Sequence, residues 1–182
     1  WLKKEIQELL KEIVSPGWCL YDIGANVGFF TVIFARLVGS SGAVVSFEPC
    51  PETFSALQRN VALNRMFQVI LRPEAVSGQD GKGTLLVSDL PIQNRLEDFG
   101  VPSFLSGRTE VSVRSLDSLL QEGTIPLPQL IKIDVEGAEV MVLRGARQLL
   151  AAARPLLLVE LHSHNREVAA LRQELARREQ ER

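Results

Sequence analysis

The sequence predicts an α/β fold with a mostly parallel sheet and helices on both faces. Short apolar runs alternate with segments of helical periodicity along most of the chain, which is typical of parallel strands joined by helical crossovers. The clearest unit is an apolar run over 18–23, a small-residue turn over 24–28 and a second apolar run over 29–38. This unit predicts a buried strand, a tight loop and a helix.

The N-terminal part extends this pattern on both sides of that unit. Apolar residues recur at helical spacing over 1–15 with mixed charges between them, so we expect an amphipathic helix that packs on the sheet. The run 43–47 is a second buried strand. Pro51 suits a first helical turn, and the apolar spacing after it predicts a helix over 51–64.

The middle of the chain departs from strict alternation of strand and helix. A short third strand is expected at 68–71, and segments 84–87 and 109–113 are expected to pair as antiparallel strands. The segment 89–108 between them carries prolines and glycines and has no clear period. Such long segments are uncommon in compact domains unless functional or mobile. We therefore expect a lid on the acceptor side of a site, with an insertion of no role as the alternative.

The C-terminal part returns to alternation. One helix is expected at 115–121, with Ser115 as its cap. Another helix is expected at 138–152, and the Arg-Pro pair that follows it ends this helix. Buried strands are expected at 130–135 and 156–161, and a charged helix at 165–182.

Composition favours a single domain over 1–182 and excludes several classes of protein. The 182 residues are 46% hydrophobic, which is enough for a core and too much for disorder. The net charge of −2 gives no general electrostatic case for nucleic acid as a partner. No apolar run reaches membrane-spanning length, so no membrane partner is expected. The two cysteines form no disulfide framework, and we expect a cytoplasmic location.

Polar residues gather where the predicted parallel strands end. In an open α/β sheet these carboxyl ends meet at one edge, where ligands bind. The candidates at five strand ends are Asp22, Gly24, Ala25, Asn26, Gly28, Phe29, Glu48, Pro49, Glu74, Ala75, Val76, Asp134, Glu136, Glu160 and His162. Their convergence predicts a binding and catalytic site.

The first loop indicates a cationic ligand rather than a dinucleotide. A dinucleotide fingerprint has three glycines and no acid near the diphosphate. The loop here has only two glycines, Gly24 and Gly28, and it follows an acid, Asp22. A carboxylate would repel a diphosphate and attract the sulfonium and ammonium of S-adenosylmethionine. The glycines would let the backbone approach that ligand. The alternative is a plain strand-turn-helix in which Asp22 caps the helix.

Glu48 closes the second strand about 20 residues after Gly28. An acid at this distance can accept hydrogen bonds from both ribose hydroxyls of an adenosine ligand. The alternative is a capping acid ahead of Pro49.

The order of several motifs resembles the FkbM-type methyltransferases. These motifs are DIGANVG, FEP, the asparagines at 60 and 64, VRSLDSLL, IKIDVEGAE and VELH, between Tyr21 and His162. The resemblance implies a Rossmann-like, class I methyltransferase sheet with the strand order 3-2-1-4-5. It also implies S-adenosylmethionine as the cofactor and methyl transfer to a small-molecule acceptor, usually a hydroxyl of a sugar or secondary metabolite.

Methyltransferase sheets usually continue past the fifth parallel strand with a helix and two more strands. The segment 165–182 has only one β-branched residue, so we expect these C-terminal strands to be missing. Strand 156–161 would then lie at an edge. The charged helix could cover this edge, or a second copy of the chain (as a homo-oligomer) or a removed C-terminal segment could complete the sheet there.

Methyl transfer to a hydroxyl benefits from a base within hydrogen-bond reach. The candidates are Asp134, Glu136, Glu160 and His162, and histidine has the unperturbed pKa best suited to this task. Asp134 could instead hold the donor, while Glu160 could orient His162 or pair with the buried Lys132. The same four candidates could also bind a divalent metal. A catalytically inactive scaffold and an NAD-dependent oxidoreductase are the rival functions.

Overall fold

The computed structural model describes residues 2–88, 94–99 and 105–161 and confirms the α/β fold. Its main sheet has the order β3-β2-β1-β8-β9, and every neighbouring pair is parallel. These strands are β1 (Cys19–Ile23), β2 (Ala43–Phe47), β3 (Val69–Arg72), β8 (Leu130–Ile133) and β9 (Leu156–Val159). The predicted core order 3-2-1-4-5 is therefore confirmed.

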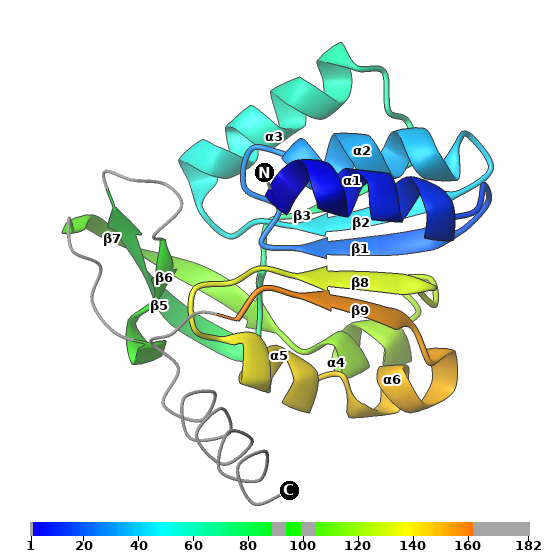
Figure 1. Ribbon diagram of the computed structural model, residues 1–182. Coiled ribbons are helices and arrows are strands. Elements are labelled where there is room, and N and C mark those ends of the chain that lie inside the picture. Colours follow the sequence, from blue (N-terminus) through cyan, green and yellow to red (C-terminus); the bar gives the residue numbers. More distant parts are fainter. Residues whose placement is uncertain (1, 89–93, 100–104, 162–182) are drawn as a thin grey trace, which may run out of the picture.

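Helices cover both faces of this sheet (Figure 1). One face carries α1 (Leu2–Ile13), α2 (Phe29–Val38) and α3 (Pro51–Leu63). The other face carries α4 (Leu116–Gln121), α5 (Glu139–Arg144) and α6 (Arg147–Ala153). In the described part of the chain, no helix is both long enough and apolar enough to cross a membrane.

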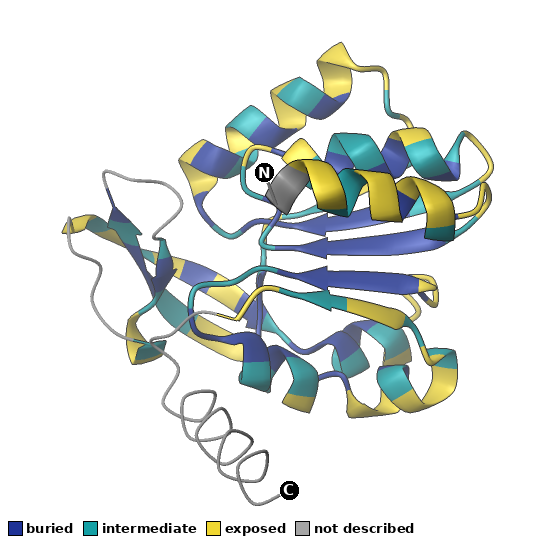
Figure 2. Ribbon diagram, viewed as in Figure 1, coloured by how far each residue is buried: buried dark blue, intermediate teal, exposed yellow. Residues whose placement is uncertain are grey.

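The core lies in two layers because strand side chains alternate between the faces of a sheet. Leu20 of β1 packs with Leu10 of α1 and Phe34 of α2. The next residue, Tyr21, belongs to the opposite layer with Leu116 of α4. Figure 2 shows the central strands β1, β2 and β8 as the buried middle of the molecule. The expectation that the N-terminal helix packs on the sheet is confirmed.

A second sheet lies beside the carboxyl ends of the main sheet (Figure 1). Its order is β4-β7-β5-β6, from the strands β4 (Ala75–Val76), β5 (Gly81–Ser88), β6 (Arg95–Leu96) and β7 (Leu105–Arg114). Strands β5 and β7 pair antiparallel, as predicted, and both are longer than the sequence suggested.

The expectation of an irregular segment over 89–108 is wrong where the structure describes it. Residues 94–99 contain β6 and a short 3-10 helix, η2 (Glu97–Phe99), and β7 already begins at Leu105. Strand β6 is only two residues long and exists through its antiparallel pairing with β5. Such a strand leaves no periodicity in the sequence. Residues 89–93 and 100–104, where the rest of the predicted lid falls, lie outside the described residues.

The helix predicted over 138–152 is two helices, α5 and α6, separated at Gly145. A Cβ on Gly145 would lie 2.2 Å from the carbonyl oxygen of Ser77, so the chain passes close to another backbone there. The carboxylate of Asp117 in α4 accepts hydrogen bonds from the backbone N–H groups of Gln148 (3.0 Å) and Leu149 (2.9 Å). This cap satisfies N–H groups in the first turn of α6 and starts a new helix.

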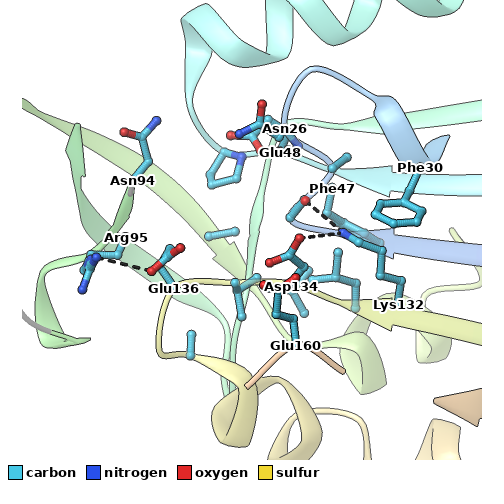
Figure 3. Close-up of a pocket in the computed structure, with 18 of the residues that line it drawn as sticks. Asn26, Phe30, Phe47, Glu48, Asn94, Arg95, Lys132, Asp134, Glu136 and Glu160 are labelled. Carbon is cyan, nitrogen blue, oxygen red and sulfur yellow. Dashed lines mark hydrogen bonds and ion pairs between the residues drawn. The ribbon is translucent and has the colours of Figure 1, made fainter. Parts of the chain in front are cut away.

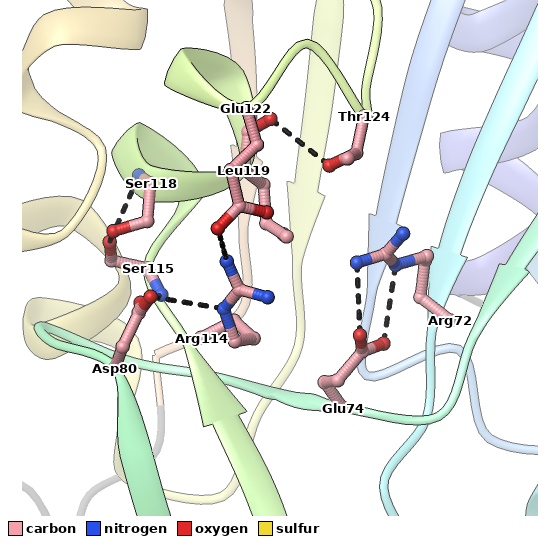
Figure 4. A network of polar contacts seen from close by, with 9 residues as sticks. All are labelled: Arg72, Glu74, Asp80, Arg114, Ser115, Ser118, Leu119, Glu122 and Thr124. Atoms are coloured by element: carbon pink, nitrogen blue, oxygen red, sulfur yellow. Dashed lines mark hydrogen bonds and ion pairs between the residues drawn. The ribbon is translucent and has the colours of Figure 1, made fainter.

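Ion pairs hold the chain where it passes between the two sheets (Figure 4). Arg114, at the end of β7, pairs with Asp80 at 3.1 Å and with Glu122. The backbone N–H of Ser115 donates to Asp80, and the Ser115 hydroxyl accepts from the backbone N–H of Ser118. Ser115 is therefore the N-cap of α4, as predicted.

Strand β9 lies at the edge of the main sheet among the described strands, as predicted. Leu156 and Leu157 on it are 48% and 46% exposed. The helix expected over 165–182, like everything after residue 161, lies outside the described residues.

Candidate active site

A cavity of about 700 Å³ lies between the carboxyl ends of the main sheet and the second sheet. Small-molecule sites commonly have this volume. Twelve of the candidates from the sequence line it: Gly24, Ala25, Asn26, Phe29, Glu48, Pro49, Glu74, Ala75, Val76, Asp134, Glu136 and Glu160. His162 lies outside the described residues.

Glu48 at the end of β2 is 6% exposed and lines the cavity. One carboxylate oxygen accepts from the backbone N–H of Asn26 at 2.9 Å, and the other accepts from the N–H of Cys50 at 3.0 Å. Burial raises the pKa of Glu48 to about 7. The hydrogen bonds from the two backbone N–H groups lower the pKa, but burial has the larger effect. The carboxylate thus holds the backbone at Cys50, just before α3, and also borders the cavity, while its role in binding a ribose stays a prediction.

Asp22 is not among the residues that line the cavity, and its expected contact with a ligand stays a prediction. Its side chain is fully buried, accepts a hydrogen bond from the Thr31 hydroxyl at 2.7 Å and pairs with the Lys132 ammonium at 3.0 Å. Nor does it cap α2, whose first turn has no side-chain cap. Asp22 is therefore a counter-charge beneath the site.

Lys132 of β8 lines the cavity and was not a candidate from the sequence. Its ammonium lies 3.3 Å from Asp134, and it donates to the Gly24 carbonyl at 3.4 Å. Burial lowers the pKa of Lys132, but Asp22 and Asp134 outweigh burial and leave the pKa above its ordinary value. Lys132 is thus cationic, and its observed partners are these two aspartates rather than Glu160.

The two glycines of the first loop are required by packing against the protein itself. Gly24 has φ +77°, and a Cβ there would lie 1.9 Å from the carbonyl oxygen of Asp134. Gly28 has φ +94°, and a Cβ there would lie 2.6 Å from Leu57 of α3. Gly28 is not among the residues that line the cavity, and its expected close approach to a ligand stays a prediction.

The second sheet supplies the opposite wall of the cavity with Leu85, Asn94, Arg95 and Leu96. Arg95 is buried and pairs with Glu136 at 3.3 Å. Figure 3 shows this pair at one end of the cavity and Lys132 with Phe30 at the other, with Asp134 between them. Arg95 was not predicted as a site residue, because the sequence around it has no periodicity that would place its side chain on the wall of the cavity.

The remaining candidates take two different environments. Glu74 lines the cavity but forms two hydrogen bonds with Arg72, at 2.9 and 3.2 Å. Glu160 follows β9, is exposed and lines the cavity, and its backbone N–H donates to Ile133 at 2.9 Å.

Comparison with known proteins places this geometry in a family. A family model described as the methyltransferase FkbM domain matches residues 22–181. The chain belongs to the FkbM methyltransferase domain family.

Three relatives of this FkbM domain illustrate its range. Methyltransferase 1 of Beauveria bassiana is 33% identical over 143 residues, which are 69% of this chain and 57% of that protein. The hexuronic acid methyltransferase AglP of Haloferax volcanii is 27% identical over 162 residues, 88% of this chain and 63% of that protein. The 31-O-demethyl-FK506 methyltransferase FkbM of Streptomyces tacrolimicus is 28% identical over 161 residues, 72% of this chain and 60% of that protein. The chain spans about three fifths of the length of these relatives.

A solved structure of an FkbM methyltransferase from Methylobacillus flagellatus has the same fold as this FkbM domain. The TM-score is 0.54 with 18% sequence identity, over 84% of this chain and 39% of that chain. At this identity the likeness concerns the fold alone.

The described residues of the FkbM domain contain no group of three or more His, Cys, Asp or Glu side chains placed to hold a metal ion. Asp134 and Glu136 are instead engaged with Lys132 and Arg95. The fourth group of the metal hypothesis, His162, lies outside the described residues.

Proposed function

We propose that this chain transfers the methyl group of S-adenosylmethionine to a hydroxyl oxygen of a small molecule. The observation that carries the proposal is the buried Glu48 carboxylate, which borders a cavity of about 700 Å³ at the strand ends of an FkbM domain. An ionised carboxylate there can accept hydrogen bonds from the two ribose hydroxyls of an adenosine group.

The charges around the cavity also suit this donor. Five carboxylates line it, and the described cations on its wall are Lys132 and Arg95. The excess of negative charge favours a ligand that carries a sulfonium and an ammonium and disfavours the diphosphate of NAD. Bound S-adenosylmethionine would supply an activated methyl group whose leaving group is a neutral thioether. The chain would mainly have to hold and align donor and acceptor.

Residues at the end of β9 are our candidates for the acceptor side. Glu160 lines the cavity, and among the described residues no side chain pairs with its carboxylate. We assign Glu160 and His162, which share the VELH motif, to removal of the hydroxyl proton. The assignment of His162 is a proposal from the sequence. Asp134 would hold the donor ammonium, because it lines the cavity and its carboxylate shares the Lys132 ammonium with the Gly24 carbonyl of the first loop.

The names of two relatives support our proposal for the class of acceptor. The names of two of them give a hexuronic acid and 31-O-demethyl-FK506 as the molecules that they methylate. We propose that the present chain likewise acts on a sugar or a secondary metabolite, and that the group it methylates is a hydroxyl.

Methyl-labelled S-adenosylmethionine and a panel of sugars, uronic acids and polyketide alcohols test the proposal. We expect label transfer to at least one hydroxyl acceptor. Glu160→Gln and His162→Ala should lower kcat while the affinity for S-adenosylhomocysteine stays unchanged. Glu110→Gln, an exposed acid of β7, is the matched control and should change neither quantity.

Two other outcomes would contradict the proposed function or the roles of Glu160 and His162 in it. Tight binding of S-adenosylhomocysteine without transfer to any acceptor would favour the inactive scaffold. Transfer that Glu160→Gln and His162→Ala leave unchanged would remove both residues from the mechanism.

A further inference from the structure

Lys132 makes a complete set of contacts at the bottom of the cavity. An ammonium has three N–H donors, and three acceptors surround this one: Asp22 at 3.0 Å, Asp134 at 3.3 Å and the Gly24 carbonyl at 3.4 Å. The ammonium also lies 5.1 Å from the ring centroid of Phe30, which faces it in Figure 3.

These contacts exclude the two direct roles that a lysine in a cavity could have. A lysine that acts as a base must lose its proton, but the two aspartates hold the pKa of Lys132 above its ordinary value. A lysine that binds the carboxylate of a ligand needs N–H groups directed at that ligand, whereas the three here have protein acceptors. Lys132 can therefore act only through the groups that it holds.

Those groups belong to three different segments. Asp22 is the last but one residue of β1, Gly24 begins the first loop, and Asp134 follows β8. Asp22 and Lys132 are register partners on adjacent strands, so the fold sets their distance. The ammonium therefore links the fixed strand β1 to two groups, Gly24 and Asp134, that line the cavity.

We propose that Lys132 is a positioning residue that holds Asp134 and the first loop in place for the aminoacyl end of the methyl donor. The inference rests on the proposed function, because it takes S-adenosylmethionine as the donor. The adenosine end lies against Glu48 in that proposal, so Lys132 should affect one end of the donor and leave the other unaffected.

In this cluster, the effect of net charge on ligand affinity can be separated from the effect of side-chain orientation. Asp22, Lys132 and Asp134 together carry one net negative charge. The double variant Asp22→Asn, Lys132→Met also leaves one, on Asp134, and it leaves no buried ion without its partner. A change in affinity in this variant therefore reports the orientation of Asp134 and the loop rather than a change in net charge.

Two ligands distinguish the ends of the donor. S-adenosylhomocysteine has the adenosine and the aminoacyl portion, while 5′-methylthioadenosine has the adenosine and the thioether only. Calorimetric titration of both into the wild type and the double variant gives a ratio of dissociation constants. We expect the double variant to lose about tenfold in affinity for S-adenosylhomocysteine, the size of one charge-assisted contact. Its affinity for 5′-methylthioadenosine should stay within about twofold, because Glu48 is unchanged.

Lys82→Met is the matched control, since it removes a lysine from an exposed ion pair with Glu110 on the second sheet. It should leave both affinities unchanged. A merely structural role for Lys132 would weaken both ligands together, and that result, or equal binding of S-adenosylhomocysteine by all variants, would overturn the inference. If the double variant does not fold, Lys132→Arg takes its place, because a planar guanidinium cannot meet the same three acceptors. Lys132→Arg should then change the ratio of the dissociation constants for S-adenosylhomocysteine and 5′-methylthioadenosine, as expected for the double variant.

Failure of the inference differs from failure of the proposed function. Wild-type protein that binds neither ligand would overturn the proposed function and this inference with it. Wild-type protein that binds both, with an unchanged ratio in the variants, would overturn only the role of Lys132.

Discussion

Glu48 shows how a single buried carboxylate can report ligand binding. Burial raises its pKa to about 7, so near neutral pH the group is divided between its neutral and ionised forms. A hydroxyl group that donates a hydrogen bond is bound more strongly by an ionised carboxylate than by a neutral carboxyl group. Binding of an adenosine ligand should therefore release a proton from Glu48.

The first prediction concerns pH. The affinity for S-adenosylhomocysteine should rise as the pH is raised towards 7 and level off above it, with a slope of at most about tenfold per pH unit. Calorimetric titrations between about pH 5.5 and pH 8 measure it. Glu48→Gln, which cannot ionise, should bind more weakly and lose this dependence. Equal pH dependence in wild type and Glu48→Gln would assign the titration to another group.

Gly24 is the second prediction at the residue scale. Alanine there would combine a positive φ with a Cβ 1.9 Å from the Asp134 carbonyl oxygen. We expect Gly24→Ala to lower the free energy of unfolding by at least about 2 kcal/mol. Urea unfolding measures this, with Gly81→Ala as the control because a Cβ on Gly81 meets nothing within 4 Å. Equal stability of the two variants would show that the loop is not packed as described.

At the scale of elements, α6 depends on a residue from another helix. Asp117 accepts hydrogen bonds from two N–H groups in the first turn of α6. Asp117→Ala should lower the free energy of unfolding by about 1–2 kcal/mol, the range for a lost N-cap. Glu12→Ala, an exposed acid of α1, is the control and should change it by less than about 0.5 kcal/mol. A loss of stability no larger than that of the control would contradict the capping role.

Elements with strong local patterns could be predicted from the sequence, and those that depend on tertiary contacts could not. The five parallel strands and the first three helices each have their own periodicity and turn residues. The break between α5 and α6 requires Asp117 and the backbone of Ser77, which lie far from it in the sequence. Strand β6 likewise requires β5.

The same distinction applies to the site. Residues at strand ends were predictable because parallel strands bring those ends to one edge. Lys132 and Arg95 were missed because their place on the cavity wall follows from their carboxylate partners, which the sequence does not pair. The register between β1 and β8 places Lys132 beside Asp22, and Asp134 follows β8 directly, which completes the cluster.

At the scale of the whole molecule, the edge strand β9 leads to a prediction about assembly. Two exposed leucines, Leu156 and Leu157, lie on this strand, which has one neighbour among the described strands. Open apolar edges favour pairing with another chain. We expect mass to increase with protein concentration in light scattering, and Leu157→Lys to reduce this increase. A monomer at all concentrations would contradict pairing through this edge.

The central claim is that the cavity binds S-adenosylmethionine for methyl transfer, and a paired calorimetric titration tests it most directly. S-adenosylhomocysteine and NAD are titrated into the wild type and into Glu48→Ala. We predict that the wild type binds S-adenosylhomocysteine and prefers it to NAD by at least about tenfold, a difference of about 1.4 kcal/mol. Glu48→Ala should lose about 1–3 kcal/mol of the binding free energy for S-adenosylhomocysteine. Preferential binding of NAD, or no binding of S-adenosylhomocysteine by the wild type, would contradict the account.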